Sequence, residues 1–262
     1  MKDLPYFLTI ACIIISVRAL ATEIPGGNVS GTWTLSGSPY NVNGDITIPL
    51  GSSLTIEAGV NVIFTGYYKM NVAGQLTALG TSGQQIHFSA ISQWHGLRIL
   101  NSNTNGQDST RLVYCHFGRG YASGSGDDSF GGAVYCNKSS DVLIRSCTIS
   151  YNSAQTRGGA IYLSYSNIRI ERSFFLSNDA GLGGAIYSSN SSPLLNQLTL
   201  TGNNATTSGG AIYKTPVNPV VTITNSILWN NSPTEIYGSN VAVNYSDIMG
   251  GYTGTGNIDL DP

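Results

Sequence analysis

The motif Gly-Gly-Ala-(Ile/Val)-Tyr occurs four times in the sequence, beginning at Gly131, Gly158, Gly183 and Gly209. The copies are 27, 25 and 26 residues apart. A second motif runs in phase with the first and places an apolar residue three positions before Asn152, Asn178, Asn203 and Asn231. A unit of this length cannot bury an apolar face by itself, whereas stacked units share one continuous core. The repeat therefore predicts a solenoid.

Short segments with apolar residues at every second position precede the asparagines, as at Val142/Ile144, Ile168/Ile170 and Val221/Ile223. The same alternation, punctuated by glycine, runs through the first half of the chain from Ile46 to Ile99. A period of two is typical of strands. We therefore predict an all-β fold, a right-handed parallel β-helix over residues 22–262 with roughly eight or nine coils at the usual repeat length.

Parallel strands stacked about 4.8 Å apart place equivalent residues of successive coils above one another. We expect one buried column at Ile144, Ile170, Leu195 and Ile223, and an asparagine ladder at Asn152, Asn178, Asn203 and Asn231. The glycine pairs should mark corners where a side chain does not fit or φ is positive. The segment Arg119–Phe130, rich in Ser, Gly and Asp, lengthens one coil and should protrude as a loop.

The first 21 residues have the pattern of a signal peptide. Lys2 is followed by an apolar stretch from Phe7 to Val17, and Ala19-Leu20-Ala21 fits the rule for signal-peptide cleavage. The apolar stretch is shorter than the roughly 20 residues that cross a bilayer. No second apolar segment follows, so we expect a secreted or cell-surface protein without a transmembrane segment.

Composition and cysteine spacing bear on partners and cofactors. The net charge is −2 and only 10% of the residues are charged, which gives no reason to expect nucleic acid as a partner. After signal-peptide removal three cysteines remain, Cys115, Cys136 and Cys147, without a Cys-x-x-Cys motif or a Cys/His cluster. We expect no metal and no cofactor, and we interpret Cys115 and Cys147 as small core residues of one column, although a disulfide between them is an alternative.

The alternation of Gly-Gly-Ala-Ile with Phe-x-x-Asn resembles the repeats of chlamydial polymorphic outer membrane proteins and related bacterial surface β-helices. The resemblance covers nearly all of the chain, including the opening segments Gly44–Pro49, Leu54–Val60 and Gly74–Gly80 and the closing segments Ser226–Asn231 and Gly256–Pro262. It implies the fold and export, and says little about activity. Such proteins often continue into a C-terminal anchoring module, so a chain ending at Pro262 is expected to be a truncated product or a short member.

Two sets of residues are candidates for binding. The tyrosines of the repeat fall in one column and should point outward as an exposed aromatic strip, because their isoleucine neighbours point inward: Tyr135, Tyr162, Tyr187 and Tyr213. Exposed rings of this kind can hold extended sugar chains, and they can equally stack to stabilise the sheet. The arginines Arg111, Arg145, Arg169 and Arg172 fall at outward positions of successive coils and could hold an acidic glycan. Alternatively they keep the face soluble, with Arg145 and Glu171 as a cross-coil pair.

These observations lead to a non-catalytic extracellular module, adhesin-like or glycan-binding, with a polysaccharide or cell-surface glycan as partner. The alternatives are a polysaccharide-degrading lyase or glycosidase, which needs two or more acids facing one groove, and a structural stalk or spacer. The acids are scattered apart from Asp127 and Asp128, which we interpret as a solvated loop tip, with a calcium site as the alternative, so we assign no catalytic residue. If the chain ends at Pro262, we also expect self-association through the open edge of the C-terminal coil.

Overall fold

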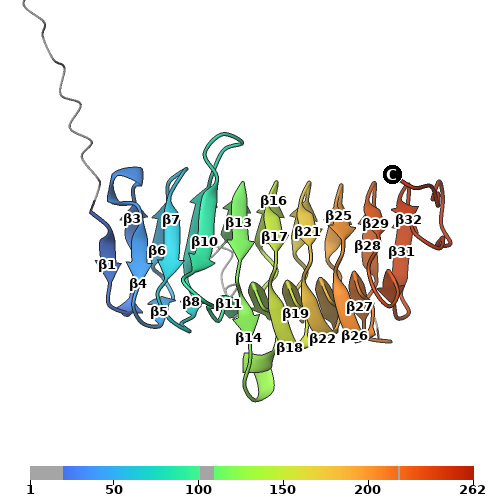
Figure 1. Ribbon diagram of the computed structural model, residues 1–262, viewed down its shortest axis with the longest axis horizontal. Helices are drawn as coiled ribbons and strands as arrows, with labels where there is room; N and C mark the ends of the chain where they lie inside the picture. Colours follow the sequence, from blue (N-terminus) through green and yellow to red (C-terminus); the bar gives the residue numbers. More distant parts are fainter. Residues whose placement is uncertain (1–19, 101–108, 218) are drawn as a thin grey trace, which may run out of the picture.

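The computed structural model describes residues 20–100, 109–217 and 219–262, so the expected signal peptide, Met1–Ala21, lies outside the described residues except for its last two. Every described strand pairs in parallel with the equivalent strand of the neighbouring coil. The coils stack along a single axis from the N-terminal end to the C-terminal end (Figure 1). The fold is a right-handed parallel β-helix, as the repeat predicts.

Three long sheets run along the stack; each of the first nine coils contributes one strand to each of them, and β32 of the last turn adds a tenth strand to sheet 1. Sheet 1 consists of β1 (Thr22–Ile24), β4 (Tyr40–Val42), β7 (Asn61–Phe64), β10 (Ile86–Ala90), β13 (Cys115–Gly118), β17 (Thr148–Ser150), β21 (Phe174–Leu176), β25 (Thr199–Thr201), β29 (Ile227–Trp229) and β32 (Asp247–Ile248). Sheet 2 consists of β2 (Gly27–Asn28), β5 (Ile46–Ile48), β8 (Met70–Val72), β11 (Leu97–Leu100), β15 (Val134–Asn137), β19 (Ile161–Ser164), β23 (Ile186–Ser189), β27 (Ile212–Lys214) and β30 (Ile236–Tyr237). Sheet 3 consists of β3 (Gly31–Trp33), β6 (Ser53–Ile56), β9 (Gln75–Leu79), β12 (Thr110–Val113), β16 (Val142–Arg145), β20 (Arg169–Glu171), β24 (Leu194–Asn196), β28 (Val221–Thr224) and β31 (Val241–Asn244).

A fourth, shorter sheet occupies only the second half of the stack. Sheet 4 consists of β14 (Tyr121–Ala122), β18 (Ser153–Arg157), β22 (Asp179–Leu182) and β26 (Asn204–Ser208), each inserted between the sheet 1 and sheet 2 strands of its coil. Coils before β14 therefore have three strands, and the next four have four. We call the place where sheet 4 begins, at β14, the step. The small inward residues of sheet 4, Ala122, Ala154 and Ala180, are buried.

The two short helices lie in loops. The 3-10 helix η1 (Leu35–Gly37) follows β3, and η2 (Gly126–Ser129) lies in the loop between β14 and β15. This second loop protrudes from the stack, as expected for the segment Arg119–Phe130 (Figure 1). No helix in the described ranges is both long and apolar enough to cross a membrane.

Inward side chains form continuous columns that fill the interior. The expected column at Ile144, Ile170, Leu195 and Ile223 is confirmed, since these residues pair in register on sheet 3 and are buried. Cys115 and Cys147 are buried with free thiols, and the backbone N–H of Cys115 lies 3.4 Å from the Cys147 Sγ. Cys115 and Cys147 are therefore core residues, and they do not form a disulfide with each other.

The corner after sheet 1 carries the expected asparagine ladder. Asn152 Nδ2 donates to Asn178 Oδ1 at 3.0 Å, and Asn178 Nδ2 donates to Asn203 Oδ1 at 2.9 Å. Each Oδ1 also accepts the backbone N–H of the preceding asparagine, at 3.1 Å from Asn152 and 3.0 Å from Asn178. The ladder ends on Glu235, whose carboxylate accepts both the backbone N–H and the side-chain amide of Asn231.

The glycine pairs have the two roles that the sequence predicts. The first glycine of each pair has φ between 65° and 68°, a conformation that glycine adopts without steric cost. The second has no room for a side chain, because a Cβ on Gly159 would collide with the carbonyl oxygen of Gly184 in the next coil.

Candidate functional site

The tyrosines of the repeat form a stacked column on the outer face of sheet 2. Tyr135, Tyr162, Tyr187 and Tyr213 pair in register, and the column continues to Tyr237 on β30. Neighbouring ring centroids are 4.9 to 5.3 Å apart. The side chains point away from the core, as the alternation predicts.

The expectation that these rings are exposed is wrong for three of them. Tyr135, Tyr162 and Tyr187 are only 2%, 6% and 5% exposed. The Phe130 ring stacks on Tyr162 at 4.7 Å, and the Arg157 guanidinium lies over Tyr187 at 5.3 Å. The loop after β14 and sheet 4 therefore cover these rings, and the accessible part of the column is Tyr237 with half-buried Tyr213.

The arginines lie on sheet 3 and its corner, but they do not form one column. Arg145 and Arg169 are exposed, and they occupy different register positions on sheet 3. Arg145 lies in register with Glu171, as expected, but the ion pairs of the described residues do not include these two side chains, and Arg169 lies in register with Leu143. Arg172 lies at the corner after β20, where its Nε donates to Gln197 Oε1 at 3.1 Å. Arg111, on β12 in the preceding coil, also lies in register with Leu143. A continuous column of cations is therefore not formed.

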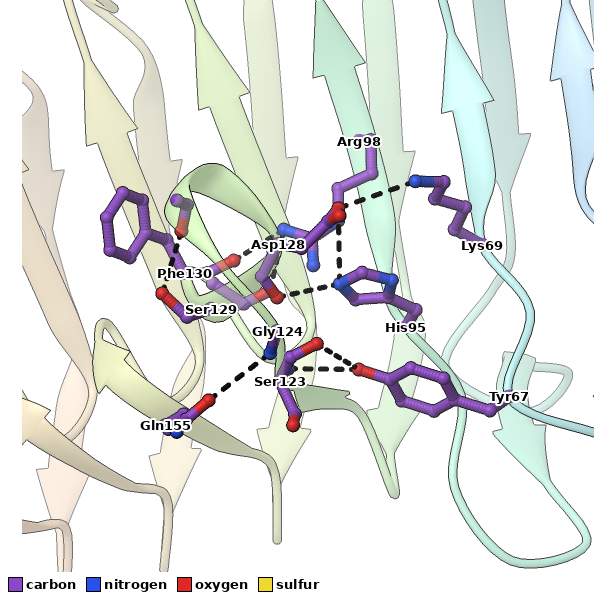
Figure 2. Close-up of polar contacts among 12 residues, drawn as sticks. Tyr67, Lys69, His95, Arg98, Ser123, Gly124, Asp128, Ser129, Phe130 and Gln155 are labelled. Carbon is purple, nitrogen blue, oxygen red and sulfur yellow. Dashed lines mark hydrogen bonds and ion pairs between the residues drawn. The ribbon is translucent and has the colours of Figure 1, made fainter.

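A polar cluster that the sequence analysis did not identify lies at the step (Figure 2). Tyr67 and Lys69 precede β8, His95 precedes β11, and Arg98 lies on β11. The loop with η2 belongs to the next coil and folds back over these residues. Alternation places Arg98 outward between inward Leu97 and Ile99, and its register partners are Asn71 and Tyr135.

Several contacts hold the loop against the earlier coils (Figure 2). Tyr67 Oη accepts the Ser123 N–H at 2.9 Å and donates to the Ser123 carbonyl at 3.1 Å, while its ring stacks on His95 at 4.9 Å. His95 Nε2–H donates to the Asp128 carbonyl at 2.8 Å. The Asp128 carboxylate lies 3.4 Å from Lys69 Nζ and 3.7 Å from His95 Nε2. Three coils thus meet at this loop.

Arg98 is the most deeply buried cation of the cluster, at 4% exposure. Its Nη1 donates to the carbonyl oxygens of Phe130 and Gly131, and its guanidinium carbon lies 5.4 Å from the centre of the Tyr135 ring. Its Nε and Nη2 have no hydrogen-bond partner. Burial lowers the pKa of Arg98 to about 10, so the side chain is cationic at neutral pH. Buried, unpaired charged donors are unusual in native proteins.

Burial also shifts the pKa values of two neighbours. It lowers the pKa of His95, and the charge of Arg98 acts in the same direction, so the imidazole is neutral at pH 7. Burial raises the pKa of Tyr135, and the contact with Asp127 raises it further. The cluster thus brings together two basic side chains, Lys69 and Arg98, and two acidic side chains, Asp127 and Asp128.

The loop lines two hollows. One, of about 350 Å³, is lined by Gly66, Tyr67, Ser92, Gln93, Tyr121 and Ser123. The other, of about 150 Å³, is lined by Lys69, Asn71, Arg98, Leu100, Asp127, Asp128 and Tyr135. A concave surface with aromatic walls and a few convergent polar groups is typical of small-ligand sites. Asp127 and Asp128 are exposed on the protruding loop, as expected of a loop tip, and both also line the second hollow.

Within the described ranges, no group of three or more His, Cys, Asp or Glu side chains is placed so that it could hold a metal ion. The cluster could have been anticipated in part from sequence, because Arg98 falls at the tyrosine position of its column one coil before the long loop. Tyr67, Lys69 and His95 lie outside the strands, where the period of two does not predict which way a side chain points.

Comparison with known proteins identifies two matching segments. Residues 146–164 and 197–215 match the family model of the Chlamydia polymorphic membrane protein repeat. Neither curated proteins nor solved structures give a significant match. Each matching segment includes one ladder asparagine, Asn152 or Asn203, and the glycine pair that follows it. The chain is similar to these repeats, which confirms the resemblance noted from its motifs and indicates a surface or outer-membrane-associated β-helix protein.

Proposed function

From this similarity to repeats of surface proteins, we propose that the chain is a non-catalytic module of the cell surface that binds glycans at the step. The ligand lies against the loop after β14 and is an extended polysaccharide or a cell-surface glycan. The stack of coils acts as a rigid support, and an adhesin-like role follows from binding at a fixed point on its side.

One observation carries this proposal: the hollow at Tyr67. Its ring is 44% exposed and faces the same space as Tyr121, Gln93 and Ser92. Aromatic rings pack against the C–H faces of sugars, and amide and hydroxyl groups bond to sugar hydroxyls. The combination fits a sugar better than it fits a purely apolar ligand.

Substitution of Tyr67 tests the proposal. Binding of the protein to a panel of immobilised polysaccharides should identify at least one ligand, and Tyr67→Ala should weaken that binding roughly tenfold or more, by analogy with about 1–3 kcal/mol per aromatic stack in nucleic-acid sites. Tyr67→Phe keeps the ring and should retain most of the affinity. Tyr165→Ala removes an exposed tyrosine away from the step and serves as the control. Equal losses in the Tyr67→Ala and Tyr165→Ala variants would reject the step as the site.

A second candidate function has one observation in its favour. Asp127 and Asp128 line one hollow, and two carboxylates facing the same space are what a glycosidase requires. Against this, Asp128 is already paired with Lys69 and His95. Incubation with polysaccharides and detection of new reducing ends or unsaturated products distinguishes the two: turnover that is lost in Asp127→Asn would establish the enzyme.

Other surfaces remain secondary candidates. The exposed Arg145, Arg169 and Arg172 could contact an acidic ligand from sheet 3, and Tyr213 and Tyr237 could extend an aromatic contact along sheet 2. Self-association through the last coil stays a prediction. A stalk without any ligand predicts no binding in the polysaccharide panel.

A further inference from the structure

The 150 Å³ hollow at Arg98 has lining chemistry that limits what it can take. Nε and Nη2 of Arg98 are buried beside the hollow without partners, and these two nitrogens form one edge of the planar guanidinium. Such an edge matches the two oxygens of a carboxylate in a bidentate hydrogen-bonded pair. Lys69, lining the same hollow, adds a second positive charge. The Arg98 side chain therefore lacks the kind of acceptor that a carboxylate supplies.

The same hollow also contains two carboxylates of the protein. Asp127 and Asp128 only accept hydrogen bonds when ionised, so they favour a ligand that carries donors. They would repel a compact anion such as phosphate or sulfate. A sugar acid satisfies both requirements, because its carboxylate can pair with Arg98 while its neighbouring hydroxyls donate to the aspartates. Leu100 and the Tyr135 ring supply apolar walls.

We infer that the hollow beside Arg98 binds a uronic acid residue of the glycan, with Arg98 as the residue that selects for the carboxylate. This inference rests on the proposed function and names the class of its ligand. The hollow at Tyr67 takes the adjoining sugar, since the same loop lines both spaces, through Ser123 in one and Asp127 and Asp128 in the other. Because Nε and Nη2 of Arg98 are buried, a ligand reaches them only when the loop that contains the exposed residues 124–128 moves outward, and this movement is part of the proposal.

The lowered pKa of Arg98 is in agreement with this geometry. Desolvation is its largest cause, and the charges of Asp128 and Asp127 offset only part of it. A ligand carboxylate would restore the stabilisation of the cation that burial removes.

The test compares the affinities of galacturonate and glucuronate oligomers with those of their methyl esters. Esterification removes the charge and keeps the shape of the chain. The wild-type protein should bind a free acid about tenfold or more tightly than its ester, as expected for hydrogen bonds to charged groups. Arg98→Lys keeps the charge but loses the bidentate edge, and it should reduce this preference to near unity. Arg169→Lys, an exposed arginine on sheet 3, should leave it unchanged.

Lys69→Gln provides a variant at a half-buried position, in case Arg98→Lys does not fold, as judged by circular dichroism. It should lower the preference for acid severalfold without loss of structure. Equal affinities of wild type for acid and ester would overturn the inference while leaving glycan binding intact. An acid preference that survives in both Arg98→Lys and Lys69→Gln would also overturn it. Absence of binding to the acid oligomers, with binding to a neutral polysaccharide in the panel, rejects the uronic acid and not the proposed function.

Discussion

At the scale of single residues, the corner asparagines show how a repeated polar side chain stabilises a stack of coils. Each buried amide satisfies a backbone N–H of the preceding coil and bonds to the next amide. The sequence predicts this ladder because identical residues recur at the repeat period. It does not predict Lys214, a charged residue that alternation turns inward, where its Nζ donates to the carbonyls of Thr215 and Val217.

Replacing one ladder residue should therefore be costly. Asn178→Ala removes the acceptor of the Asn152 backbone N–H and the donor to the Ile149 carbonyl, both of which are buried. Each unsatisfied group costs roughly 1–3 kcal/mol, so we expect a loss of about 3 kcal/mol in the free energy of unfolding by urea denaturation. Asn204→Ala, at an exposed asparagine bonded to Asp179, is the matched control and should cost less than about 1 kcal/mol. Similar losses in both variants would contradict the account.

The residue at the end of the ladder should make stability depend on pH. Burial raises the pKa of Glu235 above its ordinary value of 4.5. The folded state then holds this proton more tightly than the unfolded state, so the contribution of Glu235 to stability falls as pH rises from about 4.5 through the folded pKa. The difference in unfolding free energy between wild type and Glu235→Gln, measured from pH 4 to pH 8, should decrease with rising pH. Parallel curves would show that Glu235 has no such effect.

At the scale of elements, the loop after β14 and sheet 4 change what the repeat presents to solvent. Alternation correctly predicts that the tyrosines point away from the core. It gives no information on what covers them, because Phe130 and Arg157 come from a non-repeated loop and from an extra strand. The inserted strands also escape prediction, since their small alanines lack the apolar alternation of the other strands.

The covered tyrosines should contribute to stability rather than to binding. Tyr162→Ala removes a ring that stacks on Tyr135, Tyr187 and Phe130, and should lower the free energy of unfolding by about 3 kcal/mol. Tyr165→Ala, three residues along the chain and 59% exposed, should have little effect. A Tyr162→Ala protein that keeps its stability but loses glycan binding would restore the tyrosine column as the binding surface.

At the scale of the whole molecule, the sequence predicts the stack well and the site poorly, for the same physical reason. The described strands contact equivalent strands one coil away, so a periodic pattern is sufficient to predict the coils, the buried columns and the ladder. The cluster at the step depends on residues from three coils that do not repeat, and its loop determines their contacts. The step is also where the outline of the stack changes from three strands per coil to four.

Hydrogen–deuterium exchange with and without the best-binding polysaccharide tests most directly whether the step is the binding site. Our account predicts slower exchange in the presence of ligand at residues 66–69, 92–98 and 121–131, with little change on sheet 3. Protection confined to sheet 3 or to the last coil, or no protection in the bound protein, would contradict it.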